Sequence, residues 1–271
     1  MKNPKPKKVL ALNGSLRTGG NTAASLSLLK EELEKEVRNR AWSLEFEMIQ
    51  LSSLEVHPCR GCRICFDRGE ESCPCKDQLL ELHRSIMAAD CVVLASPVYV
   101  NDVSGTIKTV IDRLAFVCHR PAYSETPFFL MATTGGSPVR HTIRTMQAAV
   151  LSWGAPFIGT MGIKAGALSA REVLLDRYKE SLARKARMIV DYLIEEKHRS
   201  PGFFTLMVFA IQQKSWGRMF QESGTETVDS RYWKEQGWLD PGCDYYIPNH
   251  SPRLRRFTAR VFGRFLAGFM G

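Results

Sequence analysis

Short apolar runs alternate with longer amphipathic segments along the first 197 residues. A short apolar run between polar residues predicts a buried strand. The predicted strands are 8–14, 44–51, 91–98, 128–136 and 157–163. The intervening segments carry apolar residues at helical spacing, and Asp77 is suited to cap the second of them. The predicted helices are 22–37, 77–90, 105–117, 140–154 and 171–197.

Strands that alternate with helices predict an α/β protein with a doubly wound sheet. Unbroken apolar runs such as "CVVLA" at 91–95 are typical of parallel strands that are covered on both faces. Ligands of such sheets bind beyond the carboxyl ends of the strands. The functional loops should therefore follow the first, third and fourth strands directly.

The alternation stops near residue 198. We therefore predict an α/β domain over 1–198 and a helical or irregular C-terminal extension over 199–271, which serves packing or oligomerisation. The extension holds an aromatic-rich stretch and a terminal basic helix. The apolar residues on one face of that helix are Leu254, Phe257, Val261, Phe262, Phe265, Leu266 and Phe269. Such a helix can lie on an anionic membrane, but we expect it to pack on its own α/β domain or on a partner chain.

Composition narrows the class of protein. Of the 271 residues, 44% are hydrophobic and 24% are charged, which is typical of a globular protein. The net charge of +9 fits an anionic partner or simply solubility. We see neither zinc-finger spacing nor another nucleic-acid signature, so no nucleic-acid partner is expected. The basic N-terminus lacks a cleavage-site pattern and most cysteines lie in one loop, which favours the reducing cytoplasm.

Three loops at the expected sheet edge carry candidate chemistry. After the first strand, "NGSLRTGGNT" offers backbone N–H groups, the hydroxyls of Ser15 and Thr22, the charge of Arg17 and a helix N-terminus to a phosphate. This loop is neither a Walker loop nor the dinucleotide pattern, and a polar capped turn is the alternative. After the third strand comes "SPVYVN", with the flat ring of Tyr99, and after the fourth comes "TTGGS".

These three loops, in this order and spacing, resemble the flavodoxin-like NADPH-dependent FMN reductase family over roughly residues 7–195. The resemblance implies a flavodoxin-like five-stranded parallel sheet, bound FMN and NAD(P)H as co-substrate. It also implies that the flavin performs the chemistry, so no side chain is assigned as a catalytic acid or base. The residues implied to bind FMN are Ser15, Arg17, Asn21, Thr22, Ser96, Pro97, Val98, Tyr99, Asn101, Thr133, Thr134, Gly135 and Gly136.

A cysteine-rich loop raises a second question. Five of the eight cysteines lie in "CRGCRICFDRGEESCPC" at 59–75. The spacing resembles that of the iron–sulfur flavoproteins, whose corresponding loop holds a [4Fe–4S] cluster. The implied ligands here are Cys59, Cys62, Cys65 and Cys73, with Cys75 as the alternative fourth. Thiolates suit zinc equally, and unmetallated thiols stabilised by the neighbouring arginines are the third alternative. The sequence leaves all three open.

The sequence thus predicts an FMN-dependent oxidoreductase that uses NAD(P)H. One alternative is an electron carrier that relays electrons between FMN and a protein partner through a cysteine-bound cluster. A non-enzymatic flavodoxin-like binding scaffold is the other. We expect a homo-oligomer, as a dimer or tetramer, and do not expect binding to a membrane surface.

Overall fold

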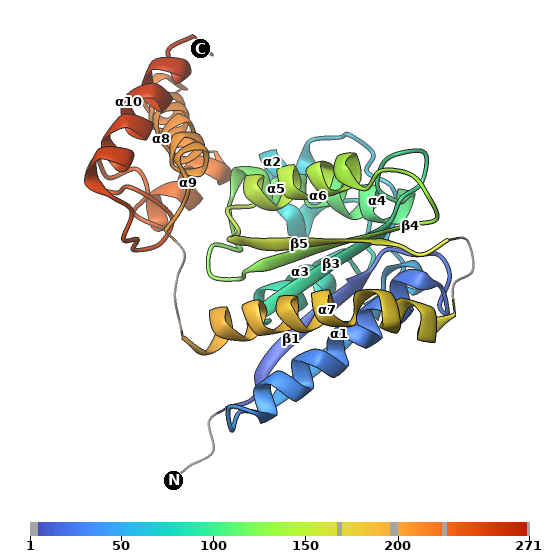
Figure 1. The fold of residues 1–271 in the computed structure, drawn as a ribbon. Helices are drawn as coiled ribbons and strands as arrows, with labels where there is room; N and C mark the ends of the chain where they lie inside the picture. The colour runs from blue at the N-terminus through green and yellow to red at the C-terminus, as the bar shows by residue number, and fades with distance from the viewer. Residues whose placement is uncertain (1–4, 167–169, 196–199, 224–226, 270–271) are drawn as a thin grey trace.

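The computed structural model describes residues 5–166, 170–195, 200–223 and 227–269. Our boundary between residues 198 and 199 lies outside these ranges, as do the last residues of the helix expected to end at 197. Five strands form one all-parallel sheet in the order β2-β1-β3-β4-β5, which confirms the flavodoxin-like α/β prediction (Figure 1). The strands are β1 (Lys7–Asn13), β2 (Leu44–Gln50), β3 (Cys91–Pro97), β4 (Phe128–Thr134) and β5 (Phe157–Lys164).

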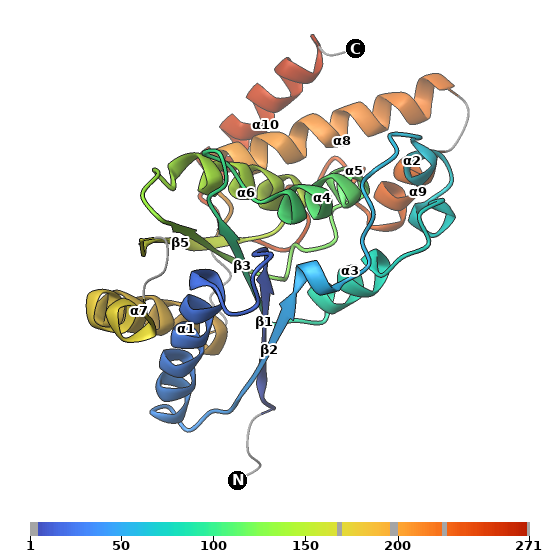
Figure 2. The same cartoon turned by 90° about the vertical axis from the view of Figure 1, so that its right-hand side faces the viewer.

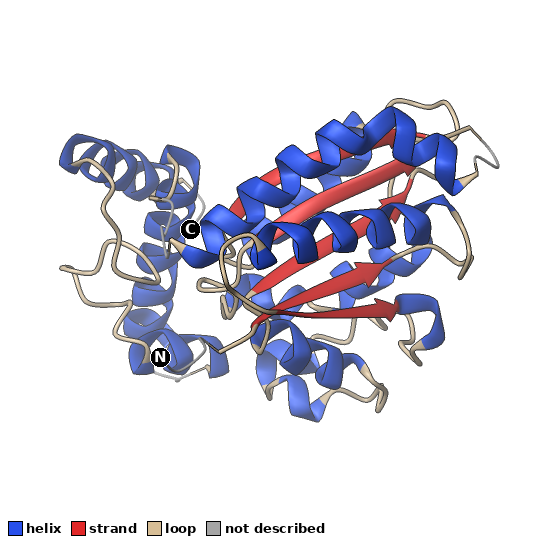
Figure 3. Ribbon diagram, turned by 60° about the horizontal axis from the view of Figure 1, so that its bottom comes forward, coloured by secondary structure: helices blue, strands red, loops and turns tan. Residues whose placement is uncertain are grey.

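Helices cover both faces of the sheet. The long helices α1 (Asn21–Arg38) and α7 (Arg171–Ile194) lie side by side across one face (Figure 3). The opposite face is covered by α3 (Leu79–Met87), α4 (Gly105–Arg113), α5 (Ala115–His119) and α6 (Arg140–Ser152). Strand β1 serves both cores, because Val9 and Ala11 pack beneath α1 and α7 while Leu10 and Leu12 pack on the other side. This two-sided burial explains why the four central residues of β1, at 9–12, are all apolar.

Two segments differ in detail from the expected pattern. The single helix expected over 105–117 is two helices, α4 and α5, which meet at Leu114. The connection between β2 and α3 contains short helical turns: η1 (Leu51–Ser53) directly after β2, and α2 (Ile64–Asp67) and η2 (Glu70–Ser72) within the cysteine-rich loop. The N-cap of α3 is Gln78, not the expected Asp77, and the Gln78 side chain makes no capping hydrogen bond. Asp77 nevertheless accepts a hydrogen bond from the backbone N–H of Leu79 at 3.2 Å.

The described part of the C-terminal extension, 200–223 and 227–269, contains three helices with a core of their own. These are α8 (Phe203–Ser223), α9 (Val228–Glu235) and α10 (Arg253–Ala267). Their core is aromatic, and it is centred on Phe209, Trp233 and Trp238. Helix α8 could not be predicted from an apolar stripe, because its apolar residues are distributed around the helix. Within the described residues, none of the helices has the length and apolar character needed to cross a membrane.

Helix α10 packs differently from our expectation. It lies along α8 through the small residues Ala259, Gly263 and Ala267, which are buried. A Cβ at Gly263 would lie 2.6 Å from the carbonyl oxygen of Met207, so glycine permits the close approach of the two helices. The apolar stripe that we expected to find against the α/β domain is instead exposed along its length. The expectation that this stripe packs on the α/β domain of the same chain is therefore wrong. Packing on a partner chain stays a prediction.

Candidate functional site

A cleft of about 490 Å³ lies at the carboxyl edge of the sheet. It is bordered by the three loops that the sequence singled out. Ten of the predicted FMN-binding residues line it: Ser15, Arg17, Asn21, Thr22, Pro97, Val98, Tyr99, Thr133, Thr134 and Gly135. Its size is within the range of small-molecule and cofactor pockets.

The first loop is held in shape from below by buried polar side chains. The Asn13 side chain accepts a hydrogen bond from the Ser15 N–H at 3.0 Å and donates one to Gln50 on β2 at 2.7 Å. Gln50 in turn donates to the carbonyl oxygen of Ser15. The Ser15 hydroxyl then accepts from the N–H of Arg17 at 3.0 Å. The loop conformation is therefore fixed before any ligand binds.

The same loop rests on the start of α4. Ser104 caps α4 and donates its hydroxyl to the carbonyl oxygen of Gly14 at 2.6 Å. A Cβ at Gly14 would lie 2.3 Å from a side-chain carbon of Ile107, so only glycine fits between the loop and this helix. The first and second loops consequently share one rigid support.

The N-terminus of α1 faces the cleft with free hydrogen-bonding capacity. Gly20 precedes the helix and provides no side-chain cap, so the N–H groups of the first turn are not taken by a capping side chain. Thr22 in this turn meets Thr133 of the third loop at 2.7 Å between their hydroxyl oxygens. Arg17 is the charged residue among the described residues that line the cleft. This combination suits a phosphate group.

The second loop turns sharply at its tip. Tyr99 and Asp102 pair through two backbone hydrogen bonds of 2.9 and 3.0 Å, and Val100 and Asn101 between them adopt the left-handed conformation with φ of 49° and 65°. The turn holds the half-exposed ring of Tyr99 beside the cleft. Such a ring offers a flat surface to a planar ligand.

Three predicted residues are not among those that line the cleft. Ser96 is fully buried, where its hydroxyl accepts from the N–H of Ser104 at 3.0 Å and so supports the second loop from behind. Asn101 is exposed at the tip of the turn. Gly136 is also exposed, and its N–H donates to the Thr134 hydroxyl at 3.1 Å.

Gly166 and Ala170 line the cleft although the sequence analysis did not select them. Both follow β5, and Asn21 donates its side-chain N–H to the carbonyl oxygen of Gly166 at 3.0 Å. These residues could have been predicted from the sequence. The fifth predicted strand was expected to run parallel to the others, and β5 is indeed parallel to β4, so its carboxyl end reaches the same edge of the sheet.

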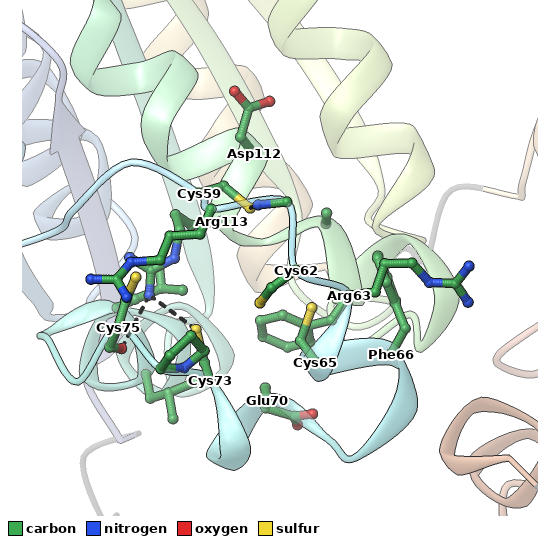
Figure 4. Close-up of a pocket in the computed structure, with 17 residues that line it drawn as sticks. Cys59, Cys62, Arg63, Cys65, Phe66, Glu70, Cys73, Cys75, Asp112 and Arg113 are labelled. Atoms are coloured by element: carbon green, nitrogen blue, oxygen red, sulfur yellow. Dashed lines mark hydrogen bonds between the residues drawn. The ribbon is translucent and has the colours of Figure 1, made fainter.

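The cysteine-rich loop encloses a second, smaller cavity of about 100 Å³ (Figure 4). All five of its cysteines line this cavity: Cys59, Cys62, Cys65, Cys73 and Cys75. Cys59 and Cys62 are exposed, whereas Cys75 is buried. Across the described residues, no group of three histidine, cysteine or acidic side chains has the arrangement needed to hold a metal ion.

A buried ion pair fixes this loop to α4. Arg113 donates to the Asp77 carboxylate at 2.6 and 3.1 Å, and these side chains are only 3% and 1% exposed. Arg113 also donates to the carbonyl oxygen of His57 at 2.7 Å. Its guanidinium lies 3.8 Å from the Cys73 sulfur (Figure 4). Burial acts to raise the pKa of Asp77, but the hydrogen bonds from Arg113 and from backbone N–H groups hold that pKa below its usual value.

A second arginine joins the loop to the C-terminal helices. Arg120 donates to the carbonyl oxygen of Cys65 at 2.9 Å and to Glu70 at 2.7 Å, and it also pairs with Asp229 on α9. Burial raises the pKa of the Cys65 thiol, and the nearby Cys73 adds to that rise, whereas Arg120 opposes it. Cys65 thus lies close enough to Cys73 for a negative charge on one of the two sulfurs to disfavour a charge on the other.

Comparison with known proteins agrees with this geometry. A family model described as NADPH-dependent FMN reductase matches residues 7–169. An iron–sulfur flavoprotein of Archaeoglobus fulgidus is 27% identical over 248 residues, which are 86% of this chain and 100% of the relative. Another, from Methanocaldococcus jannaschii, is 36% identical over 106 residues, which are 39% of this chain and 51% of the relative. The second match therefore spans about half of that protein.

Solved structures show the same fold. An oxidoreductase from Corynebacterium diphtheriae has a TM-score of 0.52 at 17% identity, with 70% of this chain and 98% of the other covered. An FMN-dependent NADH-azoreductase from Bacillus anthracis, in complex with FMN, has a TM-score of 0.51 at 12% identity, with coverages of 68% and 99%. At these identities the likeness concerns the fold alone.

Proposed function

Because this chain belongs to the NADPH-dependent FMN reductase family, we propose that it is an FMN-dependent oxidoreductase that takes electrons from NAD(P)H. The observation that carries the proposal is the cleft at the carboxyl edge of the sheet, where three loops converge on the N-terminus of α1. FMN fits this donor set, since phosphate binding requires free N–H groups, hydroxyls and a positive charge.

The residues of the cleft divide into two roles in this proposal. Arg17, Thr22 and the first turn of α1 bind the phosphate group. Tyr99, Thr133 and Gly135 border the remainder of the cleft and orient the flavin ring. When bound, FMN supplies the acceptor of a hydride from the nicotinamide. The protein contributes binding and orientation. The hydrogen bonds within the first loop already hold it in one conformation, so the loop need not rearrange to bind the phosphate.

Steady-state kinetics test this function. The purified protein is expected to oxidise NADH or NADPH in the presence of FMN and a quinone acceptor, and FMN-free protein is expected to be inactive. The rate should saturate with FMN at the concentration that saturates binding, because the flavin acts while it is bound. If both nicotinamides stay unoxidised by FMN-loaded protein, the proposed function is wrong.

An electron carrier with an iron–sulfur cluster is the second candidate function. The observation that favours it is that five cysteines line one cavity, which is also lined by Asp112 and Arg113 at the end of α4. In number and kind these thiols fit a cubane cluster. The cysteines that would hold it are Cys59, Cys62, Cys65 and Cys73, with Cys75 as the alternative fourth.

Iron analysis of protein made anaerobically with ample iron and sulfide tests this candidate. We expect about four irons per chain if a cubane cluster forms. The Cys62→Ser variant should lose most of this iron, while Cys243→Ser, outside the loop, should retain it. Iron-free protein, or iron content unaffected by Cys62→Ser, would exclude the cluster at this loop. Zinc in place of iron would exclude electron transfer through the same thiols.

The assembly and setting of the protein are further proposals. The extension has an aromatic core of its own, which supports a role in packing or oligomerisation. The clustered free thiols support a reducing cytoplasmic setting and a redox partner protein.

A further inference from the structure

The exposed apolar face of α10 takes no part in the proposed FMN cleft. Helix α10 forms the outer edge of the C-terminal helices, and in Figure 2 it lies on the far side of α8 from the sheet. Its inward face is made of small residues, as described above. Its outward face carries the large ones: Leu254, Phe257, Val261, Phe262, Phe265, Leu266 and Phe269.

The outward face is strongly apolar and continues onto α8. Phe257 is 66% exposed and Phe265 is 62% exposed. The ring of Phe262 contacts Phe203 of α8, which in turn contacts the exposed Phe204. Contiguous exposed patches of this kind mark interaction sites on soluble domains. Phe203 and Phe204 extend the patch of α10 across two helices.

Arginines border this face on both sides. With about 100° of rotation per residue, Arg253 and Arg264 fall along one edge of the outward face and Arg255 falls along the other. The remaining two arginines, Arg256 and Arg260, turn inward and pair with Asp244. Over 203–219 and 253–269 the sequence contains seven lysines and arginines and no aspartate or glutamate.

This charge pattern indicates which kind of partner binds the outward face. A second copy of the chain, docked symmetrically through the same patch, would bring arginine edges together, and neither α10 nor residues 203–219 of α8 provide an acidic residue to pair with them. An anionic lipid surface instead accepts the aromatic and aliphatic side chains below the headgroups and pairs with the bordering arginines at headgroup level. Contrary to the expectation from the sequence, we propose that the outward face of α10 docks the protein on an anionic membrane surface.

Vesicle sedimentation with the full-length protein tests the proposal. The protein is expected to sediment with vesicles that contain phosphatidylglycerol in phosphatidylcholine, and to remain in solution with phosphatidylcholine alone. Added salt should weaken the binding, because exposed charges are screened. The Phe257→Ser/Phe265→Ser variant should bind at least about tenfold more weakly, since both apolar anchors are lost. Arg253→Gln/Arg255→Gln/Arg264→Gln should weaken binding by a similar factor.

The control replaces exposed apolar residues of the α/β domain. Met87→Ser/Val173→Ser removes side chains that are 43% and 46% exposed and should leave vesicle binding unchanged. Thermal unfolding and FMN binding of each variant verify that the fold is retained. Three results would overturn the proposal: no sedimentation of the full-length protein, binding unaffected by the phenylalanine variant, or a dimer that this variant converts to a monomer without any vesicle binding.

Discussion

Replacing Arg17 and Thr22 together by alanine is expected to lower the affinity for FMN at least about a hundredfold. Hydrogen bonds to a charged group contribute about 1.5–3 kcal/mol each, and both side chains line the cleft beside the N-terminus of α1. Fluorescence titration of the apoprotein with FMN measures this change, because free and bound flavin differ in emission. The loss should be smaller for riboflavin, which lacks the phosphate.

The matched control is Arg38→Ala. Arg38 is an exposed arginine in the last turn of the same helix, so its replacement removes one positive charge at the far end of α1. Its effect on FMN affinity should be within experimental error. Equal losses of FMN and riboflavin in the double variant would contradict phosphate binding at this loop.

Replacing Asp77 by asparagine is expected to destabilise the fold by about 3–5 kcal/mol, because it leaves the charge of Arg113 buried without its partner. Urea unfolding measures this loss. Asp112→Asn is the control: Asp112 pairs with Lys108 on the surface of α4, where the carboxylate is 46% exposed, so the cost should be below about 1 kcal/mol. Similar costs for the two variants would contradict the importance of the buried pair.

Acid should remove the same contribution in the wild-type protein. The pKa of Asp77 is lower in the folded protein than in the unfolded chain, so its carboxylate stabilises the fold above the unfolded pKa of about 3.9. That contribution is lost as the pH falls through the folded pKa. The Asp77→Asn variant should therefore lose less stability than the wild-type protein in this acid range.

Local sequence pattern predicted the parts of the fold and site that depend on neighbouring residues. The apolar run of β3 and the helical spacing of α1 were sufficient to place both elements. The loop after β1 was recognisable because the residues that face a phosphate lie within a few positions of one another. Three such loops met at one edge because parallel strands end there.

The remainder depends on contacts between distant residues. Arg113 lies 36 positions from Asp77, and Arg120 lies 109 positions from Asp229. Neither pair leaves a local signal in the sequence. The orientation of α10 could not be predicted from the sequence pattern either, because the helix has two faces that could pack: one of small residues and one of large apolar residues. The close approach permitted by Gly263 decided which of them meets α8.

Anaerobic addition of NADPH, and separately NADH, to the FMN-loaded protein tests the central claim most directly. The account predicts that the visible absorbance of the flavin bleaches with at least one of the two nicotinamides, and that about one FMN is held per chain. The Arg17→Ala/Thr22→Ala variant should hold little FMN under the same conditions. A protein that binds no FMN, or whose bound FMN stays oxidised with both nicotinamides, would contradict the account.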